Sequence, residues 1–145
     1  MDVLPDLRGL KWAHTLWGLE CRWATKLDKS SIKEAAKAAL HLPESCGVTF
    51  LAKAAYNKLY IVESDNNEAV VKVTHWTKME NSRRSFHLQW LAQTTNLPIP
   101  RVLAYHIERS NVVGFEWIIM NKILGKPWVN IWKELSFTYT DNITR

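Results

Sequence analysis

The sequence predicts an α+β fold, in which an antiparallel sheet of about five strands carries one inserted helix and is preceded by N-terminal helices. Two segments, residues 48–74 and 101–120, are rich in the β-branched and aromatic residues that favour strands. Residues 82–95, which lie between them, have a helical pattern. The 145 residues, of which 47% are apolar and 23% charged, have the size and composition of one soluble domain.

The first part of the chain is expected to be helical. Residues 7–25 mix apolar and polar positions and predict a loosely helical lead-in, whose tryptophans Trp12, Trp17 and Trp23 pack onto later segments. A clearer helix follows, because Ser31 and Glu34 have the spacing of a capping box. Pro43 and Gly47 then close this helix. Its predicted buried stripe recurs at the helical period and consists of Ile32, Ala35, Ala36, Ala39 and Leu40.

The remaining elements follow from residue type and from turn signals. The predicted strand segments are residues 48–64 (one or two strands), 69–76, 101–107 and 113–123, and the predicted turns include residues 65–68 and 108–111. Ser82 is the predicted N-cap of the intervening helix, and one face of that helix carries Phe86, Trp90 and Leu91. Two prolines end the helix, and a last helix is expected to begin near Pro127.

Charge, the length of the apolar runs and the first residues of the chain argue against several classes of protein. The net charge of +5 is spread along the chain, and only Arg83 and Arg84 are adjacent, so no nucleic-acid footprint is expected despite the pI of 9.3. No apolar run approaches the ~20 residues of a membrane span. Asp2 and Asp6 argue against a signal or transit peptide, which predicts an intracellular protein, cytoplasmic rather than mitochondrial.

The cysteines and histidines predict no metal site. Cys21 and Cys46 stand alone, without a CxxC motif or a nearby histidine pair, so reduced thiols are expected. The five histidines are scattered along the chain and are expected to lie on the surface or to pack.

Lys72 is the one charged residue in the stretch "AVVKVT", residues 69–74. A lysine within a β-branched run usually faces water from the open side of a strand. A second interpretation is a phosphate-binding cation held on a rigid element. The six residues alone leave both interpretations open.

Longer segments narrow the choice. The segments "VTFLAKAAYNKLYIV", "VVKV", "LPIPRVLAY" and "SNVVGFEWIIMNKILGKPW" resemble the aminoglycoside phosphotransferase family, which has a protein-kinase-like fold. The resemblance covers residues 30–135. Within the family, the chain most resembles the eukaryotic branch that includes altered-inheritance-of-mitochondria proteins. The resemblance concerns the N-terminal lobe only. It implies a helical lead-in at 1–44, the lobe at 45–123, and a linker with the start of a truncated second lobe at 124–145.

The resemblance implies roles for three groups of residues. Lys72 is the third-strand lysine that reaches the α- and β-phosphates of ATP, and a carboxylate on the following helix would hold it. Ala54 and Ala55 lie in the loop that covers the phosphates. The segment that meets the adenine consists of Met120, Asn121, Lys122 and Ile123, and Gly125 and Pro127 fit the turn that follows it. The implied cofactor is ATP with magnesium.

The sequence also departs from the family pattern. Ala54 and Ala55 stand where a glycine usually lets backbone approach a phosphate. Arg84 stands at the position of the partner carboxylate, and Glu80 is the only carboxylate in residues 75–93. No HxDxxxxN loop is present, so the chain offers no catalytic base and no magnesium carboxylates. Weak or no ATP binding is therefore expected, with no catalytic residue in this chain.

The resemblance therefore implies the truncated nucleotide-binding lobe of a small-molecule kinase, of a family that transfers phosphate from ATP to a hydroxyl. This lobe alone is expected to be inactive. The acceptor is not indicated by any residue. The alternative is a non-catalytic, pseudokinase-like interaction module, which Arg84 and the missing glycine favour. A basic RNA-binding domain is supported by little beyond the pI of 9.3.

Trp128 and Trp132 generate a prediction about association. They are four residues apart and share a face of the predicted last helix, which a second lobe would cover. An uncovered apolar patch drives association, so we expect the chain to self-associate and Trp128→Ser with Trp132→Ser to raise its solubility. Sedimentation at high concentration checks this, and a clean monomer unchanged by the double substitution would contradict it.

Overall fold

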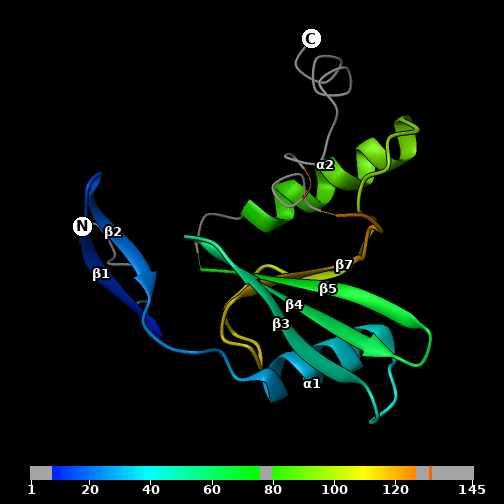
Figure 1. Ribbon diagram of the computed structural model, residues 1–145, viewed down its shortest axis with the longest axis horizontal. Helices are drawn as coiled ribbons and strands as arrows, with labels where there is room; N and C mark the ends of the chain where they lie inside the picture. Colours follow the sequence, from blue (N-terminus) through cyan, green and yellow to red (C-terminus); the bar gives the residue numbers. More distant parts are fainter. Residues whose placement is uncertain (1–7, 76–79, 127–130, 132–145) are drawn as a thin grey trace.

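The computed structural model describes residues 8–75, 80–126 and 131 (Figure 1). The elements in chain order are β1 (Leu10–Thr15), β2 (Gly18–Trp23), α1 (Lys29–Leu40), β3 (Gly47–Lys53), β4 (Asn57–Ser64), β5 (Asn67–Thr74), α2 (Glu80–Thr94), β6 (Val102–His106) and β7 (Glu116–Asn121). Strands β3 to β7 form one antiparallel sheet in the order β3-β4-β5-β7-β6, and β1 pairs with β2 in a separate hairpin. The predicted α+β fold, with five antiparallel strands and a helix inserted after the third, is confirmed.

The two faces of the sheet differ in what covers them. Figure 1 shows α1 on one side of the sheet and α2 on the other. The side that packs against α1, called the core face, carries Tyr60, Val62, Val71, Val73, Trp117 and Ile119. Because side chains alternate along a strand, their neighbours point to the opposite side. That side, called the Lys72 face, carries Leu59, Val70, Lys72, Ile118 and Met120.

Helix α1 begins earlier than predicted. Its N-cap is Asp28, whose carboxylate accepts hydrogen bonds from the Ser30 backbone N–H at 3.0 Å and from the Ser30 and Ser31 hydroxyls. These bonds, led by the one from the Ser30 hydroxyl, hold the pKa of Asp28 below its usual value. The predicted capping box of Ser31 and Glu34 is therefore wrong, because a charged acceptor three residues upstream satisfies the helix end.

The buried stripe of α1 is as predicted. Ile32, Ala35 and Ala36 are buried against the core face, and Ala39 and Leu40 pack at its edge. The helix ends at Leu40, where His41 takes a left-handed conformation with φ of 54° and its N–H bonds to the Lys37 carbonyl. The end therefore precedes both Pro43 and Gly47.

The helical lead-in expected at residues 7–25 is wrong, because the chain forms the β1–β2 hairpin there. Gly18 has φ of +107°, which only glycine adopts easily, and the Thr15 hydroxyl bonds both the Trp17 N–H and the Gly18 carbonyl across the turn. Trp23 packs into the core as predicted, but Trp12 and Trp17 are 46% and 88% exposed. Side chains alternate between the two faces of the β1–β2 hairpin, so one face is left in solvent.

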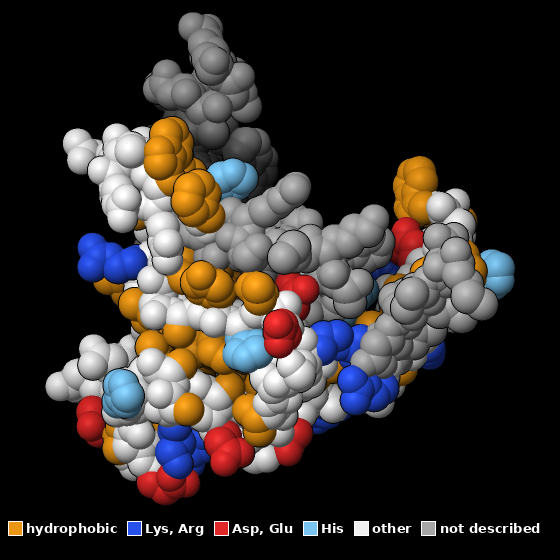
Figure 2. Space-filling view, turned by 180° about the vertical axis from the view of Figure 1, so that it is seen from behind, with side chains coloured by type: hydrophobic (Ala, Val, Ile, Leu, Met, Phe, Trp, Pro, Cys, Tyr) orange, Lys and Arg blue, Asp and Glu red, His pale blue; other side chains and the backbone are white. Residues whose placement is uncertain are grey.

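Helix α2 packs against β6 and β7 and begins at Glu80, so Ser82 is its third residue and not its N-cap. Its predicted apolar face is largely uncovered in the described part of the chain, since Phe86 is 66% and Trp90 55% exposed. Figure 2 shows hydrophobic side chains at the surface in this region. Neither α1 nor α2, the two helices of the described ranges, is long and apolar enough to cross a membrane. Pro127, Trp128 and Trp132 lie outside the described residues.

Ile32 tests the packing of α1 on the core face. Its side chain is fully buried, so Ile32→Ala removes apolar contacts and leaves a cavity. We expect the free energy of unfolding to fall by about 2–5 kcal/mol, measured by urea denaturation. Leu16→Ala is the control, since Leu16 is 99% exposed, and its effect should stay within about 0.5 kcal/mol. Equal effects of the two substitutions would contradict the assigned core.

Candidate functional site

Lys72 lies in the middle of β5, between two neighbouring strands. It stands opposite Leu59 of β4 and Ile118 of β7, and its side chain is half-buried. The flanking residues Val71 and Val73 are buried on the core face. The alternation of the strand therefore directs Lys72 away from α1, onto a face whose neighbours are apolar.

The other predicted site segments lie at the two ends of this face. The β3–β4 loop, residues 54–56, comes directly before Asn57, which pairs with Thr74. The segment 120–123 begins at the other end, where Asn121 pairs with Ala69. Lys72 stands between these two ends, about 7 Å from the first and about 10 Å from the second along the strand. The structure thus places the three predicted groups along β5 in the order loop, lysine and segment, and Met120 of the segment lies on the same face as Lys72.

The β3–β4 loop is a tight turn tied to the end of β5. The Ala54 N–H donates to the Asn57 carbonyl at 2.8 Å, which closes the turn. His75 then holds the loop twice, since its backbone N–H donates to Tyr56 O at 3.1 Å and its Nε2 lies 2.9 Å from Ala55 O. Neither Ala54 nor Ala55 has a positive φ, so the loop needs no glycine for its own conformation. The missing glycine concerns only how closely a ligand can approach.

His75 is a site residue that the sequence analysis treated as an ordinary surface or packing histidine. It is 3% exposed and packs edge-on against Trp23 and Tyr56, with ring centroids at 4.9 and 5.4 Å. Burial lowers its pKa, although the hydrogen bond to Ala55 opposes the shift. A carbonyl only accepts, so Nε2 carries the proton that holds the loop.

The segment 120–123 is held in place by Met120, Asn121 and Lys122. Met120 is half-buried and pairs with Val70 and Val102. Asn121 bonds Arg101 twice, through its N–H to the Arg101 carbonyl at 3.0 Å and through its Oδ1, which accepts the Arg101 N–H. Lys122 forms an ion pair with Glu68, with Nζ and Oε2 2.6 Å apart.

Glu116 is a second residue that the sequence analysis missed. It is 4% exposed and opposes Thr74, which places it on the Lys72 face, one diagonal step from Lys72. Diagonal residues on adjacent strands are about 7–8 Å apart between Cα atoms, which long side chains can span. The resemblance implied a carboxylate on α2, where the side chains of Glu80 and Arg84 lie outside the described part. The available signal for Glu116 was a single glutamate within the otherwise apolar stretch "FEWIIM".

The described residues offer no cluster for a metal ion. No three His, Cys, Asp or Glu side chains gather anywhere in the ranges that the structure describes. Cys21 and Cys46 are buried free thiols. The face therefore presents a cation, a buried carboxylate and an apolar floor, and it does not fit a magnesium ion by itself.

Comparisons with known proteins show the fold. No protein-family model matches the chain. An alignment of 94 residues, which covers 59% of this chain and only 18% of each relative, is 27% identical to subtelomeric hrmA-associated cluster proteins from two strains of Aspergillus fumigatus. The crystal structure of a protein assigned as an aminoglycoside phosphotransferase, from Ralstonia eutropha, matches 70% of this chain and 29% of its own, with a TM-score of 0.54 and 18% identity. The sheet with its inserted helix is thus a kinase-like small lobe.

His75 gives the lobe a predicted pH dependence. Its folded pKa lies below the ordinary value of 6.5, so the unfolded state takes up the proton first as the pH falls. The stabilisation is therefore fully present above about pH 6.5 and is lost as the pH drops through the lower, folded pKa. We expect His75→Gln, whose amide can still donate to the loop, to show a smaller loss of stability between about pH 7.5 and pH 5.

Urea denaturation of both proteins at the two pH values measures this difference. The other four histidines are present in both proteins and cancel in the comparison. An equal loss in the two proteins would show that His75 is not the group that titrates.

Proposed function

We propose that this chain is the N-terminal nucleotide-binding lobe of an aminoglycoside-phosphotransferase-like small-molecule kinase. The observation that carries the proposal is the position of Lys72, on the face opposite α1 and between the β3–β4 loop and the segment 120–123. The structural likeness to the Ralstonia protein supports the fold on which this rests. The match covers only 29% of that protein. Transfer of phosphate to a hydroxyl is therefore proposed to need residues in addition to those of this lobe.

The described residues fit the nucleotide part of ATP. The Lys72 ammonium would meet oxygens of the α- and β-phosphates, and its rigid strand limits the entropy lost on binding. Val70 and Met120 would form an apolar floor for the base and sugar, next to the backbone of Lys122 and Ile123. Ala55, in the loop at the opposite end, would lie over the phosphates. The described residues do not hold magnesium, and we assign no step to it.

Glu116 is proposed to hold Lys72 in place of the helix carboxylate that Arg84 replaces. A buried carboxylate on the same face attracts an ammonium strongly, because few water molecules screen the pair. The pair would keep the lysine extended over the apolar floor. In this role Glu116 is a positioning residue and does not contact the nucleotide.

A non-catalytic interaction module is the second candidate. Arg84 and the absence of a metal-binding cluster among the described residues favour it. The two candidates differ in whether the Lys72 face binds ATP. In either case we expect the 145-residue chain alone to transfer no phosphate to a hydroxyl above background.

Substitution of Lys72 tests the proposed site. Lys72→Met removes a charged hydrogen bond worth about 1.5–3 kcal/mol, so ATP affinity should fall at least about tenfold. Ligand-detected NMR titration measures this even where binding is weak. Lys11→Met is the matched control, because Lys11 is an exposed hairpin lysine far from this face in the sheet topology, and it should leave the affinity unchanged.

Glu116→Gln should weaken ATP binding in the same direction, and the double variant should be no weaker than Lys72→Met. That non-additivity separates a positioning role from a general loss of stability. ATP binding that is equal in the wild type and in Lys72→Met would contradict the proposal. No binding at all would favour the interaction module.

A further inference from the structure

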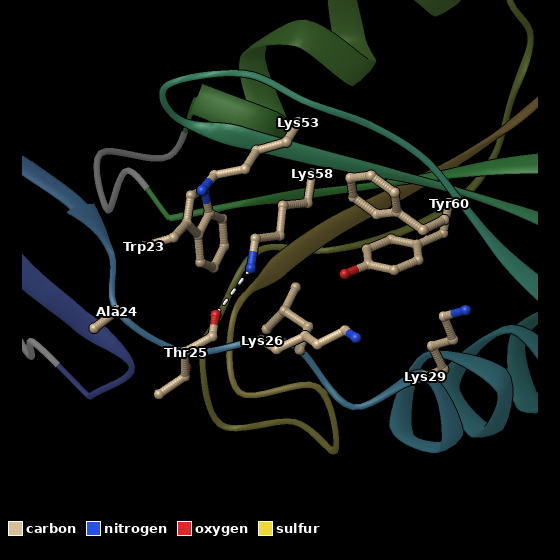
Figure 3. Close-up of a pocket in the computed structure, with 10 residues that line it drawn as sticks. Trp23, Ala24, Thr25, Lys26, Lys29, Lys53, Lys58 and Tyr60 are labelled. Atoms are coloured by element: carbon tan, nitrogen blue, oxygen red, sulfur yellow. Dashed lines mark hydrogen bonds between the residues drawn. The ribbon is translucent and has the colours of Figure 1, made fainter.

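A cavity of about 360 Å³ lies on the core face, on the other side of the sheet from Lys72. It is an open cavity bordered by the end of β2 and the segment after it, by β3 and β4, and by the start of α1 (Figure 3). Among the residues that the structure describes, four lysines line it, namely Lys26, Lys29, Lys53 and Lys58, and no aspartate or glutamate does. We call this cavity the lysine pocket. The nearby Asp28 carboxylate is engaged by Ser30 and Ser31 at the cap of α1.

Lys58 is the buried lysine of the lysine pocket, and its position is fixed by its contacts. Its side chain is only 6% exposed, and its Nζ donates to the Thr25 carbonyl at 2.9 Å. The same ammonium lies 4.5 Å from the centre of the Trp23 ring. Burial, and then the nearby charge of Lys53, lower the pKa of Lys58. A buried ammonium without a carboxylate is costly to the fold, and an anion in the pocket would offset that cost.

The other three lysines come from separate elements. Lys26 precedes α1, Lys29 begins it and Lys53 ends β3, and all three are exposed. Three exposed lysines therefore line the same cavity as the buried Lys58, and the cavity is positively charged. The charge of Lys53 already acts on Lys58, and a ligand with two negative charges would relieve this repulsion.

Aromatic side chains supply the apolar wall of the lysine pocket. Trp23 and Tyr60 are 7% and 2% exposed, and Phe50 meets Tyr60 edge-on at 5.6 Å between ring centres. Burial raises the pKa of the Tyr60 hydroxyl, which therefore stays protonated and able to donate. Figure 3 shows this hydroxyl directed toward the lysine side chains. Phe50, which is 46% exposed, is the open ring of this wall, so the pocket combines one accessible ring with lysine donors for an anion.

We propose that the lysine pocket is a second ligand site, which binds a small aromatic phosphate. A phosphate dianion matches a cavity that four lysines line, and a single ring matches the open ring of Phe50. The volume of about 360 Å³ is near the lower end for ligand pockets, which fits one ring with one phosphate. The site is separate from the proposed nucleotide site, because the sheet lies between Lys58 and Lys72.

Calorimetric titration of the 145-residue chain with phenyl phosphate tests the lysine pocket. We expect phenyl phosphate to bind at least about tenfold more tightly than inorganic phosphate or phenol, because each of these supplies only half of the recognised chemistry. Lys26 and Lys53 are exposed, so we expect Lys26→Gln and Lys53→Gln to leave the fold intact. Each should weaken binding at least about tenfold, as expected for the loss of a charged hydrogen bond.

Two further variants make the result decisive. Lys11→Gln removes one exposed hairpin lysine and should leave the affinity within about twofold. Lys58→Gln should abolish binding, and urea denaturation will show whether it still folds. The proposal is overturned by equal effects of Lys11→Gln and Lys53→Gln, or by no binding at about 10 mM phenyl phosphate. Binding lost in Lys72→Met but kept in Lys26→Gln and Lys53→Gln would place the anion on the opposite face and also overturn it.

Discussion

The alternation of side chains along β5 is the constraint on which the rest of the lobe depends. Val71 and Val73 are buried against α1, so Lys72 between them must point to the other face. A slip of one residue would bring the lysine into the apolar core and the valines out of it, so the burial of the valines fixes the register. The same register sets the distances from Lys72 to the β3–β4 loop and to Asn121. The packing of α1 therefore determines the geometry of the opposite face.

The sheet separates two groups of charged residues, one on the Lys72 face and one on the core face. On the Lys72 face, Lys72 and the buried Glu116 lie beside the apolar residues Val70, Ile118 and Met120, with Thr74 on the same face. On the core face, Lys58 and its neighbouring lysines collect positive charge beside aromatic rings. The modest net charge of +5 conceals this local concentration. His75 lies between the two regions, since its ring packs on Trp23 of the lysine pocket while its Nε2 holds the β3–β4 loop.

The sheet and the place of Lys72 could be predicted because both follow from local patterns. The β-branched residues of "AVVKVT" predict a strand, and β5 carries Lys72 as that prediction requires. The predicted turn at 65–68 is also present, although it is shorter, because β4 ends at Ser64 and β5 begins at Asn67. Asp28 was missed because either serine could have capped α1, and the choice depends on where the hairpin delivers the chain. The hairpin itself was missed because glycine and tryptophan spacing at residues 7–25 fits neither period cleanly. Glu116 and Lys58 acquire their roles from partners on other strands, which no single segment of sequence specifies.

The central claim is that ATP occupies the Lys72 face of the sheet and that the core face does not take part. Chemical-shift mapping of the backbone amides with a non-hydrolysable ATP analogue tests this directly. The account predicts perturbed amides at residues 54–56, around Lys72 and at 120–123, with those of α1 and of residues 23–29 unchanged. Perturbations confined to α1 and residues 23–29, with none around Lys72, would contradict it.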